Sequence, residues 1–167
     1  IPPAHEAWRV GVFVNGIRNT DGRGASPSGR APEPSRASAQ MMKVLFDTSV
    51  LVAAMVEPHP MHGRALPWLR RAKAGEYDYV VASHTVAELY AVLTTLPLIP
   101  RISPGAAWRL IHENVETIAT VVSLSASEYG TTIKRIAELG LSGGVIYDAL
   151  IAQAAQKAGV RRLLTFN

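Results

Sequence analysis

The sequence predicts an α/β fold in which a parallel sheet is covered by helices on both faces. From residue 43 onward, short apolar or β-branched segments alternate with longer segments of helical periodicity. Gly, Pro or cap residues separate the segments. The sequence contains no internal repeat and no heptad array, which argues against a solenoid or a coiled coil.

Length and composition favour one globular domain. The chain has 167 residues, of which 48% are hydrophobic and 18% charged, and this size supports a single core. There is no cysteine, so disulfides and thiolate metal sites are excluded, and we expect a cytoplasmic protein. No apolar run approaches the roughly 20 residues that span a bilayer, and the N-terminus lacks the layout of a signal peptide.

The composition changes near residue 40. Residues 15–40 are rich in Gly, Pro, Ser, Ala and Arg and contain almost no large apolar residue, so we expect them to be disordered. Met41 and Met42 directly precede the first clear strand. We therefore expect residues 1–40 to be a disordered or non-native N-terminal extension and residues 41–167 to form the domain. A basic tail that binds nucleic acid is the alternative. The net charge of +4 is shared evenly between the two parts, so residues 41–167 are only mildly basic.

Caps and breaks set the expected element boundaries. Thr48 or Ser49 can cap the first helix, Pro104 suits a first helical turn, and Gly159 suits a helix end. Ser83 or His84 opens another helix, and Ser125 or Ser127 a further one. Strands are expected at 43–47, 78–82, 117–122 and 161–166, and helices at 48–56, 62–74, 83–96, 103–114, 125–139 and 145–158.

Three acidic residues are candidates for chemistry. Asp47 ends a predicted strand, and ligands of parallel sheets bind beyond the carboxyl ends of strands. Glu88 and Asp148 each stand among apolar residues of a predicted helix, and we expect Glu88 to be partly buried. Taken singly, Asp47 suits a helix cap and Glu88 a solvated helix face, whereas Asp148 has no basic residue one turn away. Converging carboxylates repel one another unless a cation compensates, and oxygen-only clusters hold Mg²⁺ or Mn²⁺ beside phosphates.

Four segments in this order resemble one family. They are VLFDTSVLVAA, ASHTVAELYAVLTTLP, GLSGGVIYDALIAQAAQKAG and LLTFN. On these segments, residues 42–167 resemble the PIN-domain family, most closely the VapC-like toxin ribonucleases of toxin–antitoxin pairs. The resemblance implies a three-layer α/β/α sandwich with a central, mainly parallel sheet. It also implies metal-dependent endonucleolytic cleavage of RNA phosphodiester bonds.

The resemblance also implies site residues. Asp47, Glu88 and Asp148 match the three acids of the family, and Asn167 stands where relatives often have Asp or Asn. We expect Asp47 and Asp148 to bind Mg²⁺ or Mn²⁺ directly. Glu88 would ligate through water, hold a second ion or orient the attacking water, with Thr48 or Ser49 supporting the cluster.

Two departures from the family pattern stand out. Asn167 brings no charge, and the chain stops there, so we expect a C-terminally truncated domain. A catalytically inactive PIN-like module that binds RNA or protein is therefore the alternative function. A dehalogenase-like phosphatase would need an Asp where Ser49 stands, and a phosphotransfer receiver would need a Lys at a strand end near the C-terminus.

The expected partners are an RNA substrate, a cognate antitoxin and a second copy of the chain. We expect no association with a membrane. A leucine-rich run serves either the core or such a partner surface; it comprises Leu89, Leu93, Leu96, Leu98 and Ile99.

Other candidates rank lower. His59 and His62 have a spacing suited to a transition metal, but a surface loop is favoured. His84 is expected to be a cap neighbour, and Arg70, Arg71 and Lys73 a solvated basic face. No P-loop, Rossmann fingerprint or serine nucleophile elbow is present.

Overall fold

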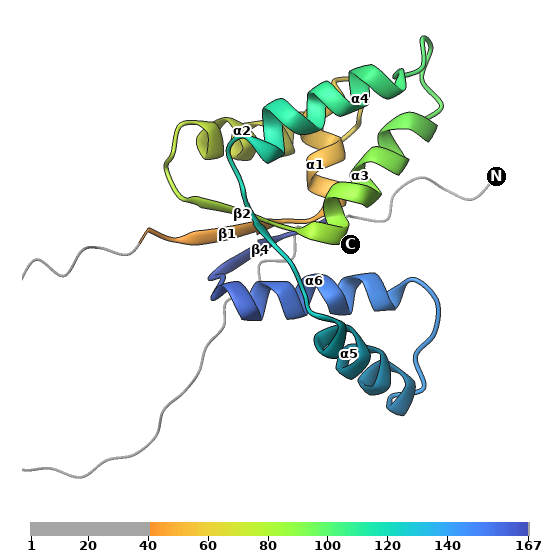
Figure 1. The fold of residues 1–167 in the computed structure, drawn as a ribbon. Coiled ribbons are helices and arrows are strands. Elements are labelled where there is room, and N and C mark those ends of the chain that lie inside the picture. Colours follow the sequence, from red (N-terminus) through yellow and green to blue (C-terminus); the bar gives the residue numbers. More distant parts are fainter. Residues whose placement is uncertain (1–40, 167) are drawn as a thin grey trace, which may run out of the picture.

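The computed structural model describes residues 41–166, which form a three-layer α/β/α sandwich (Figure 1). Its sheet has four parallel strands in the order β3-β2-β1-β4. They are β1 (Lys43–Phe46), β2 (Asp78–Ala82), β3 (Thr120–Val122) and β4 (Arg162–Leu164). The predicted fold class is confirmed. The expected extension, residues 1–40, and Asn167 lie outside the described residues.

Helices cover the two faces of the sheet unequally (Figure 1). On one face lie four helices, α1 (Thr48–Met55), α2 (His62–Lys73), α3 (Ser83–Thr95) and α4 (Pro104–Ile111). A short π-helix, η1 (His112–Glu116), extends α4. On the other face lie α5 (Ala126–Glu138) and α6 (Val145–Ala158).

The alternation of side chains along β1 explains why both faces need cover. Val44 and Phe46 pack into the core beneath α1–α4, whereas Leu45 packs into the core beneath α5 and α6. All three are fully buried. Successive residues of a strand point to opposite faces, so a central strand with apolar residues on both faces must be covered on both sides.

Several boundaries differ from the expected ones. Asp47 occupies the N-cap of α1, in place of Thr48 or Ser49, and its side chain makes no capping hydrogen bond. The helix expected over 103–114 changes to π geometry at His112, and β3 begins only at Thr120. The expected caps Ser103 and Ser125 do accept backbone N–H groups, and Gly159 ends α6 with φ +66°.

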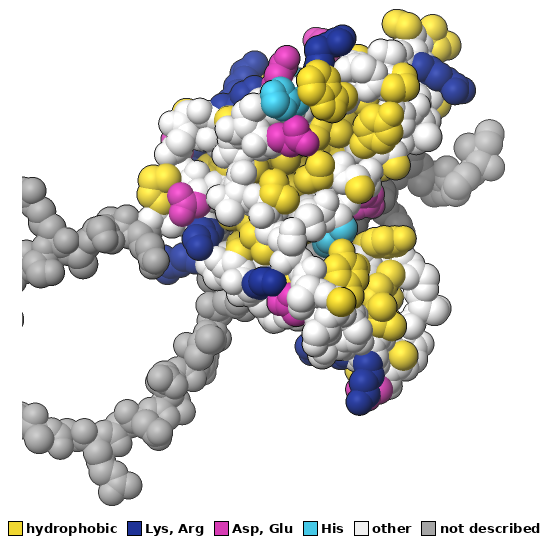
Figure 2. Space-filling view, viewed as in Figure 1, with side chains coloured by type: hydrophobic (Ala, Val, Ile, Leu, Met, Phe, Trp, Pro, Cys, Tyr) yellow, Lys and Arg dark blue, Asp and Glu magenta, His cyan; other side chains and the backbone are white. Residues whose placement is uncertain are grey.

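The leucine-rich run divides between core and surface. Leu89 and Leu93 of α3 are fully buried, whereas Ile99 is fully exposed. The core interpretation therefore holds for the helical part of the run. Figure 2 shows hydrophobic side chains on this face of the molecule over α4 and beside α5 and α6. The exposed large apolar residues include Trp108 of α4 and Ile133 of α5.

The chain order places a crevice beside β1. The chain runs from β1 to β2 and β3 on one side, then returns to β4 on the other side of β1. Ligands of parallel sheets bind where the order reverses in this way, outside the carboxyl ends of the strands. The junction of β1 and β4 is therefore the expected ligand site. Within residues 41–166, no helix is long and apolar enough to cross a membrane.

Candidate active site at the carboxyl end of the sheet

Asp47 lies at the carboxyl end of β1 and is only 4% exposed. Its backbone N–H donates to the Leu164 carbonyl at 3.0 Å, which continues the pairing of β1 with β4. Its Oδ2 accepts one hydrogen bond from the Ser49 hydroxyl and another from the Thr165 hydroxyl, both at 2.8 Å. The carboxylate is thus oriented by two hydroxyls from either side of the strand junction.

Ser49 also connects this junction to the end of the described chain. Its Oγ accepts the backbone N–H of Phe166 at 3.1 Å while donating to Asp47. One hydroxyl therefore joins α1, the carboxylate and the segment after β4. The hydroxyl is partly buried, so these bonds have little competition from water.

Glu88 reaches the same region from α3. Its Oε2 accepts a hydrogen bond from the Thr48 hydroxyl at 2.6 Å. Thr48 is buried and Glu88 is half-buried. The two supporting hydroxyls proposed from the sequence thus serve different acids, since Thr48 contacts Glu88 and Ser49 contacts Asp47.

Asp148 lies in the first turn of α6 and is exposed. Although Asp148 stands among apolar residues in the sequence, those residues do not bury it. Ile151 and Ala154 of the same helix are buried in the core that packs on the sheet, whereas the side chain of Asp148 is accessible to solvent. A carboxylate also suits the first helical turn, where the helix dipole is positive.

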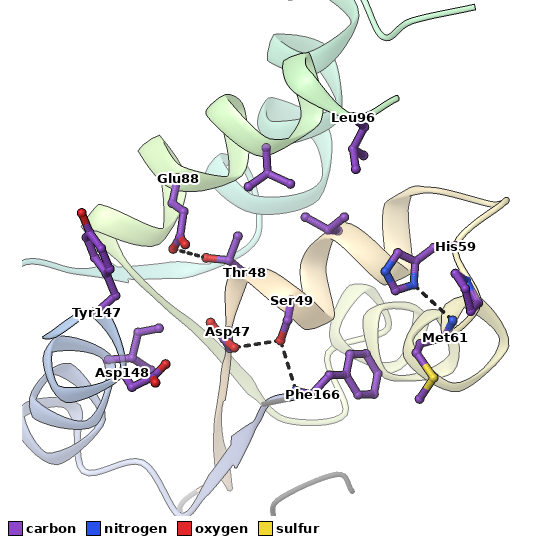
Figure 3. A pocket seen from close by; sticks show the side chains of 14 residues that line it. Asp47, Thr48, Ser49, His59, Met61, Glu88, Leu96, Tyr147, Asp148 and Phe166 are labelled. Carbon is purple, nitrogen blue, oxygen red and sulfur yellow. Dashed lines mark hydrogen bonds between the residues drawn. The ribbon is translucent and has the colours of Figure 1, made fainter. Parts of the chain in front are cut away.

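The three acids line one cavity of about 560 Å³, with Asp47 from β1, Glu88 from α3 and Asp148 from α6 (Figure 3). In Figure 3 these carboxylates lie toward one end, and apolar side chains surround the other end. The remaining lining residues are Thr48, Ser49, Val52, His59, Pro60, Met61, Val92, Leu96, Tyr147, Ile151 and Phe166.

The charges around this cavity fit a divalent cation. Within residues 41–166, neither Asp47 nor Glu88 forms an ion pair with Lys, Arg or His. A buried carboxylate without a counter-charge is unfavourable, and a cation would relieve that cost. In the same part of the chain, no three His, Cys, Asp or Glu side chains are grouped closely enough to hold one ion together. Mg²⁺ needs only one or two carboxylates because it keeps several waters.

His84 lies in the first turn of α3, one turn before Glu88. Both its ring nitrogens are buried and have no hydrogen-bond partner within the described residues. Burial lowers the pKa of His84, and the nearby carboxylates of Glu88 and Asp47 partly oppose that change. The ring is therefore neutral at pH 7. The N-cap of α3 is Ala82, so His84 belongs to the helix itself.

Both His59 and Tyr147 line the cavity. The sequence analysis considered His59 only as a possible metal ligand together with His62, and it did not consider Tyr147. His59 Nδ1 accepts the Met61 backbone N–H at 3.1 Å, and His62 Nδ1 contacts the Ala53 carbonyl oxygen at 2.9 Å. Each imidazole thus binds a backbone group, which does not support a shared metal. The Pro58-His59-Pro60 break between two helices was the available signal for His59, and the position next to Asp148 was the signal for Tyr147.

Comparisons with known proteins agree with this fold. The family model of the PIN domain matches residues 44–167. Ribonuclease VapC27 of Mycobacterium tuberculosis is 34% identical over 109 residues, which cover 65% of this chain and 74% of that protein. Ribonuclease VapC40 of the same species is 35% identical over 117 residues, which cover 70% of this chain and 81% of that protein.

A solved structure supports the fold independently. The crystal structure of M. tuberculosis VapC20, described as a sarcin-ricin loop cleaving toxin, has a TM-score of 0.54 and 18% identity. The match covers 70% of this chain and 84% of VapC20. Because the family model covers most of the chain and two relatives are about one third identical to it, the chain belongs to the PIN domain family, and these two relatives are VapC ribonucleases.

Proposed function

We propose that this chain is an endoribonuclease that hydrolyses RNA phosphodiester bonds with Mg²⁺ or Mn²⁺ held by Asp47 and Asp148. The observation that carries the proposal is one cavity lined by three carboxylates from separate elements. Asp47 and Glu88 have no ion-pair partner within residues 41–166. Two relatives named as ribonucleases support the choice of RNA as substrate.

The chain's own residues would orient the reacting groups. Ser49 and Thr165 donate to one oxygen of Asp47, and these two hydrogen bonds would fix the direction of that carboxylate. Glu88, oriented by the Thr48 hydroxyl, would orient the attacking water and accept its proton. When bound, the cation would lower the pKa of a bound water and neutralise charge on the phosphate. Asn167 would add an uncharged polar contact.

The biological role that we propose is that of a toxin silenced by an antitoxin protein in the cytoplasm. VapC20 is described as a toxin, and the family resemblance implies an antitoxin and a homodimer. Exposed apolar residues such as Trp108 and Ile133 provide surface for such contacts. Light scattering of the purified chain would measure the dimer, and only a monomer at every concentration would contradict it.

A module that binds RNA or protein without cleaving is the second candidate. Two observations favour it: Asp148 is exposed, and no group of three acids is assembled within the described residues. An inactive module would bind the same RNA whether or not divalent cations were present.

Substitution of the acids tests the proposal directly. Asp47→Asn and Asp148→Asn should each lower RNA cleavage in Mn²⁺ by about 100-fold or more, as expected when a preorganised charged group is removed. EDTA should abolish cleavage by the unmodified chain. Asp78→Asn is the matched control, since Asp78 begins β2 at the opposite end of the sheet. Full activity of either site variant, or activity in EDTA, would reject the assignment.

A further inference from the structure

We propose that the apolar half of the cavity binds one unstacked base of the RNA, with His59 donating a hydrogen bond to the base edge. The apolar half comprises Val52, Pro60, Met61, Val92, Leu96 and Phe166. This inference rests on the proposed function, because it assigns the substrate group that lies next to the scissile phosphate. It makes the preferred substrate a single-stranded or looped RNA, since a paired base cannot enter a pocket.

The size of the cavity exceeds what the acids require. A volume of about 560 Å³ falls within the range of pockets that enclose organic ligands, which is roughly 300–1,000 Å³. The carboxylates occupy one end, and the other end is lined by apolar side chains (Figure 3). A hydrated ion and a phosphate gain nothing from apolar walls, whereas the flat faces of a base do.

His59 supplies a donor with a defined position in this apolar wall. Its Nδ1 accepts the Met61 N–H, so the proton of the neutral ring is on Nε2. Burial, and secondarily the neighbouring His62, lower the pKa of His59 and favour this neutral form. Within residues 41–166, no hydrogen bond to Nε2 is formed. A base offers ring nitrogens and carbonyl oxygens as acceptors, whereas an apolar peptide side chain would leave the donor unpaired.

Phe166 connects the apolar half to the catalytic end. Its ring lines the cavity and is 7% exposed. Its backbone N–H donates to Ser49, which in turn donates to Asp47. A base that packs against Phe166 would therefore touch an element bound to the carboxylate through one hydroxyl. Tyr147, half exposed beside Asp148, adds a second aromatic ring to the lining on the acidic side.

An RNA series that lacks one base at a time tests the subsite. The full chain is assayed in Mn²⁺ on a fluorescent oligonucleotide that it cleaves, with an abasic ribonucleotide placed at each position around the cut. Loss of one base-to-aromatic contact should lower kcat/KM about 10- to 100-fold at a single position. Val92→Phe and Leu96→Phe, which fill the apolar half, should lower cleavage of intact RNA similarly. In these variants the abasic change should have less than about a twofold further effect.

The controls separate the base from other occupants. Val121→Phe, at an exposed position of β3, introduces the same side chain away from the cavity. In this variant, removal of the base at the sensitive position should lower kcat/KM as much as it does in the unmodified chain. His59→Ala should reduce discrimination among the four bases at the sensitive position, and His59→Gln, which keeps an N–H donor, should restore part of it. If removal of the base lowers kcat/KM in Val92→Phe and Leu96→Phe as much as in the unmodified chain, the proposed base subsite is rejected. The cavity then binds another occupant, such as a peptide.

Failure of the subsite and failure of the nuclease are distinguishable. If RNA is cleaved but no abasic position matters, the subsite is rejected while the proposed function stands. If no RNA is cleaved, NMR signals of the Met61 methyl group and the His59 ring are followed in EDTA. Millimolar AMP, GMP, CMP and UMP are the probes. Shifts confined to the apolar half would support the subsite, and unchanged signals would overturn it.

Discussion

The two faces of the sheet carry unequal cores, and each core holds a different part of the candidate site. Among the described residues, 21 buried apolar residues form the core beneath α1–α4, whereas six form the core beneath α5 and α6. Asp47 and Glu88 belong to the first side, and Asp148 belongs to the second. The relative position of the three carboxylates therefore depends on how α6 packs against the smaller core.

This difference explains why one half of the site is preorganised. Asp47 and Glu88 each accept hydroxyl hydrogen bonds from residues next to them in the fold. Asp148 is carried by a helix that packs on the sheet through Ile151 and Ala154. A small movement of α6 changes the separation of Asp148 from the other acids. The position of Asp47 and Glu88 is therefore fixed within the face covered by α1–α4, whereas the position of Asp148 depends on the packing of α6 on the other face.

The largest effect on stability should come from the larger core. Leu93→Ala removes a fully buried side chain of α3 and should lower the free energy of unfolding by about 2–5 kcal/mol, because it leaves a cavity. Chemical denaturation at pH 7 measures the change. Ile99→Ala, at a fully exposed position, should change stability by less than about 0.5 kcal/mol. Equal losses in both variants would contradict the assigned core.

A change in the smaller core should affect cleavage more than its stability cost suggests. Val80→Ala removes two methyl groups beneath α6 and should lower the free energy of unfolding by about 1–2.5 kcal/mol. Cleavage should still fall about tenfold at a temperature where the variant is fully folded, because α6 positions Asp148. Val121→Ala, on the exposed edge strand, is the control. Unchanged cleavage by Val80→Ala would show that α6 does not depend on this contact.

His84→Leu should alter the pH dependence of stability with little effect at pH 7. Because the pKa of His84 is lowered in the folded state, the unfolded chain binds the proton first as the pH falls. Stability is therefore lost below about pH 6.5, and the leucine variant should lose less between pH 7 and 5. At pH 7 its stability should change by less than about 1 kcal/mol, since both ring nitrogens lack partners within residues 41–166. Unfolding curves at pH 7 and pH 5 measure the change. An equal loss of stability in the unmodified chain and the leucine variant would contradict the prediction.

The smallest effect on stability should come from the ion pair between Glu128 of α5 and Lys157 of α6. The hydrogen bond from Lys157, and then those from Ser125, lower the pKa of Glu128 from 4.5 to about 2. Its contribution to stability is present above pH 4.5 and is lost as the pH falls toward 2. Glu128→Gln should remove this part of the acid sensitivity. Glu138→Gln, where the partner Lys134 is 3.8 Å away on the same helix, should retain the loss of stability in acid. Identical dependence of stability on pH in the two variants would argue against a stabilising Glu128–Lys157 pair.

Much of the larger side was predictable from the sequence. The apolar run before Asp47 predicted a central strand ending in a carboxylate, and the chain order placed that end beside β4. Glu88 was expected to be partly buried, and it is half-buried. Asp148 also stands among apolar residues in the sequence, yet it is exposed, whereas Ile151 and Ala154 of α6 are buried. The role of Asn167 remains a prediction, since the residue lies outside the described range.

By itself, the sequence determined the alternation of strands and helices and the strand-end location of Asp47, because residue periodicity and turn chemistry act over a few neighbouring positions. Only the tertiary structure decided which hydroxyl serves which acid and that α6 presents Asp148 to solvent. It also decided that His59 and an apolar wall share the cavity with the acids. These features depend on how elements that are distant in the chain pack against one another. The direction in which a side chain points after packing cannot be read from its neighbours in the sequence.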